Sequence, residues 1–186
     1  MNKLVIDNEK YKGLMISICR DIAASGWTPD YIVGLTRGGL SPAVLISQWF
    51  GIRCETLKVS LRDENGESES NLWMAEDAYG YVDASGFPRP EDEVTTDPSL
   101  RKNILIVDDI NDSGATINFI LEDWASGCMP HDPAWNDIWN HNVRFATVVD
   151  NLASKANVKM DYVGMEINKS ENDVWVEFPW ENWWTK

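Results

Sequence analysis

The sequence has few cysteines, and their arrangement excludes two kinds of framework. Among its 186 residues only Cys19, Cys54 and Cys128 are cysteines, and no two of them form a Cys-x-x-Cys pair. An odd number of widely spaced cysteines argues against a disulfide framework and against a structural zinc site. We therefore expect reduced thiols and a cytoplasmic protein.

The sequence also lacks long apolar runs and an excess of basic side chains. No stretch approaches the ~18 consecutive apolar residues of a membrane-spanning helix, and the N-terminus has no apolar leader segment. The 16 Lys and Arg residues against 30 Asp and Glu residues give a net charge of −14. That charge repels nucleic acids and anionic membranes, so we expect neither as a partner. A polyanionic substrate would have to arrive with a metal ion or meet a locally basic site.

The sequence also has no Gly-x-x-x-x-Gly-Lys-Ser/Thr pattern, and this absence excludes a Walker-type phosphate loop. In its place, residues 104–107 form an apolar, β-branched run that is typical of a buried parallel strand and stops at Asp108 and Asp109. Carboxylates at this point are suited to accept hydrogen bonds from sugar hydroxyls or to bind a divalent cation.

A polar turn and a helix are expected directly after these carboxylates. At a helix N-terminus the unpaired backbone N–H groups and the positive end of the dipole favour a phosphate. The residues at this start are Ser113, Gly114, Ala115 and Thr116. Together with the two carboxylates, they predict a site for a phosphorylated sugar.

Strand and helix patterns alternate along the chain. Apolar residues recur at helical spacing over residues 11–22 and 40–49. The expected strands are residues 31–35, 54–60 and 103–107. This alternation predicts an α/β fold, a parallel twisted sheet flanked by helices on both faces, in one domain over residues 1–186. Ligands of such sheets bind outside the carboxyl ends of the strands.

Two segments do not fit this alternation. Residues 61–101 contain prolines and acidic runs, and we interpret them as a long flexible loop that forms an active-site flap, with a solvated surface insertion as the alternative. Residues 125–142, rich in Trp, Pro and Asn, are interpreted as a surface or oligomer-contact insertion. Their two histidines, His131 and His141, have no metal-binding spacing.

The segment from Asn103 to Thr116 resembles the phosphoribosyl-pyrophosphate (PRPP) signature of type I phosphoribosyltransferases. In that signature an apolar strand leads into two acidic residues and a short Asp-Ser/Thr-Gly-x-Thr loop. The resemblance implies the fold of this family and Asp109 as a ligand of Mg²⁺. The PRPP-binding residues that it implies are Asp108, Asp109, Asp112, Ser113, Gly114, Ala115 and Thr116.

Two further segments resemble the purine members of that family. The run Thr36-Arg37-Gly38-Gly39 is similar to their pyrophosphate-binding loop, which implies that Arg37 and Gly38 contact pyrophosphate. Residues 172–181 resemble their base-recognition segment, a C-terminal hood. There Trp175 would stack on the purine and the Val176 carbonyl would read its edge, with a core-packing role as the alternative for Trp175.

One position departs from the resemblance. Members that act on 6-oxopurines usually carry a lysine just after the strand that follows the PRPP helix. Here that strand, residues 143–149, is followed by Asp150 and Asn151. Either Lys155 reaches the base from a longer loop, or Asn151 makes a weaker neutral hydrogen bond to it. The preferred purine therefore stays open.

The activity that the resemblance implies is transfer of ribose 5-phosphate from PRPP to a purine nitrogen with release of pyrophosphate, by a homo-oligomer (dimer or tetramer). Mg²⁺ and Arg37 would stabilise the leaving pyrophosphate. Asp112 would take or hold the purine proton, with N-capping through the N–H of Gly114 or Ala115 as its alternative role. Two other functions stay open, a non-catalytic PRPP-sensing regulator and a magnesium-dependent phosphosugar hydrolase.

Overall fold

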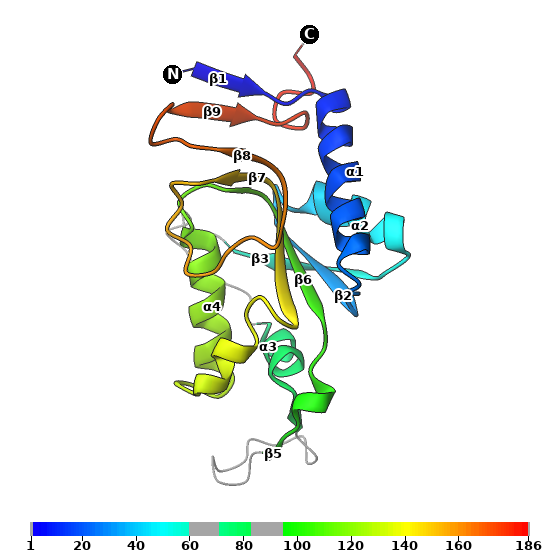
Figure 1. The fold of residues 1–186 in the computed structure, drawn as a ribbon, viewed down its shortest axis with the longest axis vertical. Coiled ribbons are helices and arrows are strands. Elements are labelled where there is room, and N and C mark those ends of the chain that lie inside the picture. The colour runs from blue at the N-terminus through cyan, green and yellow to red at the C-terminus, as the bar shows by residue number, and fades with distance from the viewer. Residues whose placement is uncertain (1, 60–70, 83–94, 186) are drawn as a thin grey trace.

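The centre of the protein is a sheet of five parallel strands (Figure 1). The computed structural model describes residues 2–59, 71–82 and 95–185. The strand order is β3-β2-β6-β7-β8, and every neighbouring pair is parallel. The strands are β2 (Tyr31–Thr36), β3 (Cys54–Lys58), β6 (Ile104–Asn111), β7 (Val143–Asn151) and β8 (Tyr162–Ile167). All five carboxyl ends therefore lie at one edge of the sheet.

Helices cover both faces of this sheet, as the α/β pattern predicts. In Figure 1, α1 (Asn8–Ala24) and α2 (Leu40–Phe50) lie on one side, while α3 (Leu72–Tyr79) and α4 (Ala115–Gly127) lie on the other. Helix α1 is N-capped by Asp7, whose carboxylate accepts the Lys10 N–H at 2.8 Å. Its buried residues recur every three or four positions, so one apolar stripe packs on the sheet: Tyr11, Met15, Ile18, Cys19 and Ile22.

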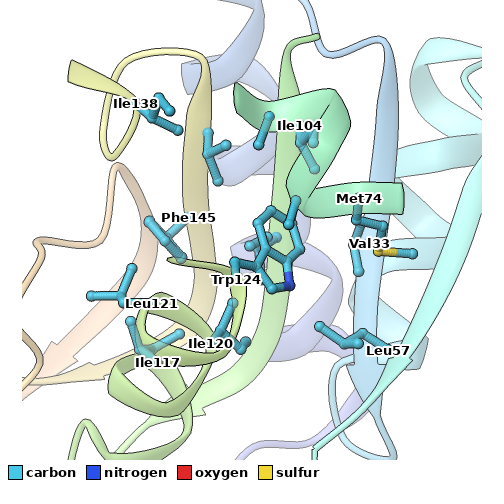
Figure 2. Packing of buried hydrophobic residues seen from close by; sticks show 14 of the residues in the cluster. Val33, Leu57, Met74, Ile104, Ile117, Ile120, Leu121, Trp124, Ile138 and Phe145 are labelled. Atoms are coloured by element: carbon cyan, nitrogen blue, oxygen red, sulfur yellow. The ribbon is translucent and has the colours of Figure 1, made fainter. Parts of the chain in front are cut away.

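The core on the α3–α4 side is built around Trp124 of α4, which is 2% exposed (Figure 2). Strand residues Val33, Ile104 and Phe145 and helix residue Met74 surround it. A Trp side chain buries a large apolar area, so this contact fixes α4 firmly against the sheet. The N-terminal end of α4 is thereby held at a defined place on the carboxyl edge.

Strand β6 is longer than the sequence indicates. The expected strand ended at Val107, but β6 continues through Asp108 and Asp109 to Asn111. Beyond Val107 it pairs with β7 alone, while the last two residues of β2, Leu35 and Thr36, pair only with β3. The last pair with β7 is Asn111 with Asp150. The ladder on the β7 side therefore holds Asp108, opposite Thr147, and the residue that follows Asp109, Ile110, opposite Val149. Strand β3 is shorter than expected and ends at Lys58.

Part of the segment 61–101 belongs to the core rather than to a flap. Helix α3 buries Met74, Ala75, Ala78 and Tyr79 against the α4 side of the sheet. The short elements that follow are β4 (Tyr81–Val82), β5 (Thr95–Thr96) and the 3-10 turn η2 (Pro98–Leu100). The flap interpretation now concerns only residues 61–70 and 83–94, which lie outside the described part of the chain.

The segment 125–142 is also partly core. Trp135, within the 3-10 turn η3 (Pro133–Asp137), and Ile138 are buried, whereas His131 and His141 are exposed. The Trp135 ring stacks on Trp139 with centroids 5.1 Å apart. The segment thus closes the core at the edge where β7 begins, and its role as an oligomer contact stays a prediction.

The first and last strands form a separate two-stranded layer. Strands β1 (Asn2–Val5) and β9 (Val174–Glu177) run parallel, with Lys3 opposite Trp175, and Figure 1 shows them together beyond the end of the main sheet. Lys3 Nζ and Glu177 Oε2 are 2.6 Å apart. We call this layer the hood. No helix in the described part of the chain is both long and apolar enough to span a bilayer.

Candidate functional site

A cleft of about 580 Å³ lies between the carboxyl edge of the sheet and the hood. The whole run from Asp108 to Ile117 lines it, and so do Thr36, the last residue of β2, and Gly38 in the turn that follows. The hood contributes Trp175 and Val176, and Phe178 and Glu181 follow from the chain beyond β9. Lys169, after β8, also lines it, so segments that are far apart in the sequence share one cavity.

The start of α4 forms one wall of the cleft and leaves backbone donors open. Gly114 is the N-cap in the left-handed conformation (φ 85°), and no side chain caps the helix there. The Ala115 N–H reaches only the Ser113 hydroxyl, at 3.3 Å. The uncapped N–H groups and the helix dipole make this wall suitable for a phosphate.

Gly114 has a second reason to be glycine. A Cβ at this position would overlap the backbone N of Ala156, in the loop after β7. A side chain is thus excluded by the positive φ and by the neighbouring loop, besides any ligand. Replacement of Gly114 by Val would displace that loop, so the variant tests local packing as well as phosphate binding.

The two carboxylates at the end of β6 lie side by side and half-buried. Burial, together with the neighbouring Asp109 charge, raises the pKa of Asp108 well above its ordinary value. Burial also raises the pKa of Asp109, and the charge of Glu181 adds to this effect. In the described part of the chain neither aspartate has an ion-pair partner. The pair is suited to a cation that would balance this charge.

The turn after β2 packs directly against these carboxylates. A Cβ at Gly38 would overlap the Asp109 carboxylate, and one at Gly39 would overlap the Val107 carbonyl oxygen. Two glycines are therefore needed for the loop to lie against β6. Arg37, joined to Thr36 by a cis peptide bond, belongs to the same turn and is exposed, but it is not among the residues that line the cleft.

Asp112 does not cap α4, contrary to the alternative role considered for it. Its Oδ2 lies 2.9 Å from Lys169 Nζ, and its Oδ1 and backbone carbonyl accept hydrogen bonds from Asn151 Nδ2 at 3.3 and 2.9 Å. The carboxylate is half-exposed and faces the cleft. Asp112 is thus held by side chains from two other segments.

The two residues considered for the missing lysine do not face the cleft. Asn151 is only 6% exposed, and its amide is used to hold Asp112 and the backbone N–H of Lys169. Lys155 is exposed and outside the cleft lining, although its backbone N–H bonds to the Ser113 carbonyl. The lysine that lines the cleft is Lys169, after β8, which sequence reasoning missed. A fifth strand recognised at residues 162–167 would have pointed to it.

Trp175 lines the cleft from the hood. It is 46% exposed, so it is not a core residue, while the next residue, Val176, is buried. Beyond them, Phe178 stacks on Trp180 with centroids 4.9 Å apart, and Trp180 packs edge-on against Tyr11 of α1. The aromatic contacts fix the strand so that the Trp175 indole forms a wall of the cleft.

The fold and the site define a class. The family model described as "Phosphoribosyl transferase domain" matches residues 6–182, and the chain belongs to this family. It is an enzyme of the phosphoribosyltransferase type. The resemblance drawn from the PRPP signature and the α/β fold prediction are thereby confirmed.

Individual relatives narrow the comparison to purine enzymes. A xanthine-guanine phosphoribosyltransferase of Roseobacter denitrificans is 26% identical over 185 residues, covering 91% of this chain and 86% of the relative. A purine phosphoribosyltransferase structure from Pyrococcus horikoshii aligns with a TM-score of 0.59 and 20% identity over 98% of this chain and 96% of that chain. The Helicobacter pylori xanthine-guanine-hypoxanthine phosphoribosyltransferase aligns at 0.60 and 16% identity, over 97% and 95% of the two chains.

Proposed function

We propose that this chain is a purine phosphoribosyltransferase that transfers ribose 5-phosphate from PRPP to a free purine base and releases pyrophosphate. The observation that carries the proposal is one cleft with three chemically distinct walls. An uncapped helix start suits a phosphate, paired carboxylates suit sugar hydroxyls and a cation, and an exposed indole suits a planar base. The names of the relatives support the same reaction.

PRPP would bind along the β6–α4 loop. The backbone N–H groups from Ser113 to Thr116 would hold the 5-phosphate, and Asp108 and Asp109 would accept hydrogen bonds from the ribose hydroxyls. Gly38 would admit pyrophosphate close to the backbone, and Arg37, a permanent cation, would balance its charge.

Magnesium fits the acidic pair, because both carboxylates are buried and neither has a balancing positive charge among the described residues. No group of three or more His, Cys, Asp or Glu side chains converges in the part of the chain that is described. Such a site suits Mg²⁺, which is held by one or two carboxylates together with substrate phosphates. Asp109 would hold the ion, which when bound supplies positive charge against the leaving pyrophosphate.

The purine would lie against Trp175, with its edge toward the Val176 carbonyl. Stacking of a base on an aromatic ring contributes roughly 1 to 3 kcal/mol. Asp112, which lines the same cleft, would take the proton of the attacking base or hold it at N7. Its carboxylate is already oriented by Asn151 and Lys169.

The proposal includes a cytoplasmic homo-oligomer and excludes nucleic acid and membranes as partners. The net charge of −14 supports the exclusion of polyanionic partners. Sedimentation of the purified protein would measure the oligomeric state, with a dimer or tetramer expected.

The test is pyrophosphate release from PRPP and Mg²⁺ with a panel of guanine, xanthine, hypoxanthine, adenine and uracil. Release that depends on a purine supports the proposal. Release that is independent of base would instead indicate a phosphosugar hydrolase. PRPP binding without release, with any base of the panel, would indicate a PRPP-sensing regulator.

A further inference from the structure

The chain that leaves β7, residues 151–157, lies directly against the β6–α4 loop, and we call it the supporting segment. The cleft lining in the described part of the chain contains none of its residues. The Lys155 N–H donates to the Ser113 carbonyl at 3.1 Å, and a Cβ on Gly114 would overlap the backbone N of Ala156. The backbone that would hold a phosphate therefore rests on the backbone of a second segment.

Asn118 ties the supporting segment to the first turn of α4. Its Nδ2 donates to the Lys155 carbonyl at 2.9 Å, and its Oδ1 accepts the Asn157 N–H at 2.7 Å. A single amide thus binds the backbone on both sides of Ala156. Asn118 therefore sets the position of the residue that packs against Gly114.

Two side chains attach the start of the supporting segment to the end of β6. Asn151 Nδ2 donates to the Asp112 carbonyl at 2.9 Å, and Ser154 Oγ donates to Asn111 Oδ1 at 3.0 Å. Ser154 Oγ also accepts the Ala156 N–H at 3.2 Å, which stiffens the segment itself. The supporting segment is thus attached to the β6–α4 loop at both of its ends and in the middle.

The β6–α4 loop needs such support because its centre has no regular structure of its own. Strand β6 ends at Asn111 and helix α4 begins at Ala115, so the three residues between them belong to neither. Backbone N–H groups bind a phosphate well when several of them point at it together. If the loop took this shape only part of the time, the Kd would rise by the inverse of that fraction. The attachments to the supporting segment supply the order before a ligand binds.

We propose that the supporting segment holds the β6–α4 loop in its phosphate-binding shape in the ligand-free protein, and that Asn118 is the positioning residue that fastens it. The proposal rests on the proposed function, because it takes this loop as the site of the PRPP 5-phosphate. Asn118 and Ser154 act through the backbone of the loop, since neither lines the cleft.

Three variants separate this role from general packing. Asn118→Ala removes both hydrogen bonds of the amide and leaves a residue of high helix propensity, so α4 itself is not weakened. Ser154→Ala breaks the attachment to Asn111 from the other side. Asn157→Ala is the matched control, because only its backbone N–H bonds to Asn118 and the residue is exposed and outside the cleft lining. Thermal melts of all variants check that the fold is kept.

Two readouts are measured on each variant. Calorimetry gives the Kd of ribose 5-phosphate and the Kd of pyrophosphate with Mg²⁺, which are the two halves of PRPP. Amide hydrogen exchange over residues 151–157 in the ligand-free protein reports whether the segment is held in place.

Asn118→Ala should raise the Kd of ribose 5-phosphate about 5- to 100-fold, as expected for the loss of two hydrogen bonds that order the loop. It should leave the Kd of pyrophosphate within about twofold and speed amide exchange over residues 151–157. Ser154→Ala should change both readouts in the same direction by a smaller factor. Asn157→Ala should match the wild type.

An unchanged Kd of ribose 5-phosphate in Asn118→Ala would overturn the proposal, and so would an equal loss of affinity for both halves of PRPP. Weaker binding without faster exchange, or a wild type that binds no ribose 5-phosphate, would also overturn it. If Asn118→Ala does not fold, Ser154→Ala decides by the same criteria. Failure of the proposed function is a separate result. In that case the wild type transfers ribose 5-phosphate to no base, while the Kd values of the variants still decide the role of the supporting segment.

Discussion

Asp108 and Asp109 link the stability of the ligand-free protein to pH, because burial raises the pKa of both carboxyl groups. In an unfolded chain an aspartate titrates near pKa ~3.9. Between that value and the raised folded pKa, the native state binds more protons than the unfolded state. The free energy of unfolding therefore falls as pH rises through this window.

Asp108→Asn should remove the Asp108 part of this dependence. An asparagine Oδ1 can still accept the Asp109 N–H, which Asp108 accepts at 2.9 Å. We expect the variant to match the wild type in melting temperature near pH ~4 and to be more stable near pH ~7, by about 1.4 kcal/mol for each unit of raised pKa. PRPP affinity should fall. A variant that melts below the wild type at the higher pH would contradict the assignment.

Substitution of the two cleft carboxylates, Asp109 and Asp112, should impair different properties of the enzyme. Asp109→Ala should chiefly weaken binding of PRPP with Mg²⁺, measured by calorimetry. Asp112→Asn keeps an oxygen for Lys169 but cannot take a proton, so kcat should fall roughly 10²- to 10⁴-fold with PRPP affinity retained. Wild-type turnover in Asp112→Asn would refute its chemical role.

Trp175 should matter for the base and little for folding. Its exposure argues against the loss of roughly 3 to 5 kcal/mol that a core tryptophan would give on truncation. Trp175→Ala should raise the purine KM about 5- to 150-fold and leave the PRPP KM unchanged, whereas Trp175→Phe should be mild because a ring remains. A much lower melting temperature of Trp175→Ala with a normal purine KM would show instead that Trp175 packs in the core.

At the residue scale, the sequence was informative where the chemistry lies within one motif. The run from Asp108 to Thr116 was predicted to line a phosphosugar site, and the structure places all of it on one cleft. The partner of Asp112 was not predictable in this way. Lys169 comes 57 positions later, and its role depends on how β7 and β8 pair.

At the scale of elements, the hood depends on pairing between the two ends of the described chain. Strand β9, which carries Trp175, has β1 as its only strand partner in the described residues. Removal of residues 1–5 would leave the backbone groups of β9 on that side unpaired and the indole poorly positioned.

This truncation should raise the purine KM and leave PRPP affinity nearly unchanged, because β1 pairs with β9 and not with the β6–α4 loop. Lys3→Ala is the matched control, since an exposed ion pair contributes only about 0.2 to 1 kcal/mol. Equal purine KM values for the truncated and full-length proteins would show that β1 does not position the base site.

Elements were predictable where one face of a helix or a long apolar run dominates, as in α1 and the first half of β6. Strand β8 was missed because Gly164 interrupts its apolar pattern. A Cβ there would overlap the Val148 carbonyl oxygen and press on Leu14 of α1, so close packing of the helix requires the glycine. Helix α3 was missed because it is only eight residues long and lies within a polar segment.

At the scale of the whole molecule, the alternation of strands and helices was enough to predict a parallel sheet with a site at its carboxyl edge. The hood was predicted from resemblance alone, because a parallel pair between residues 2–5 and 174–177 leaves no local signal in the sequence. Because the chain as a whole is acidic, a polyanionic substrate needs local positive charge, and among the described residues Lys169 is the cation that lines the cleft.

The most direct test of the central claim, that this cleft joins ribose 5-phosphate to a purine, is identification of the product. The protein is incubated with PRPP, Mg²⁺ and hypoxanthine, and the mixture is resolved by chromatography with mass detection. The account predicts a purine 5′-monophosphate and pyrophosphate in equal amounts, both strongly reduced in Asp109→Ala. Free ribose 5-phosphate beside unchanged hypoxanthine, or no product with any purine, would contradict it.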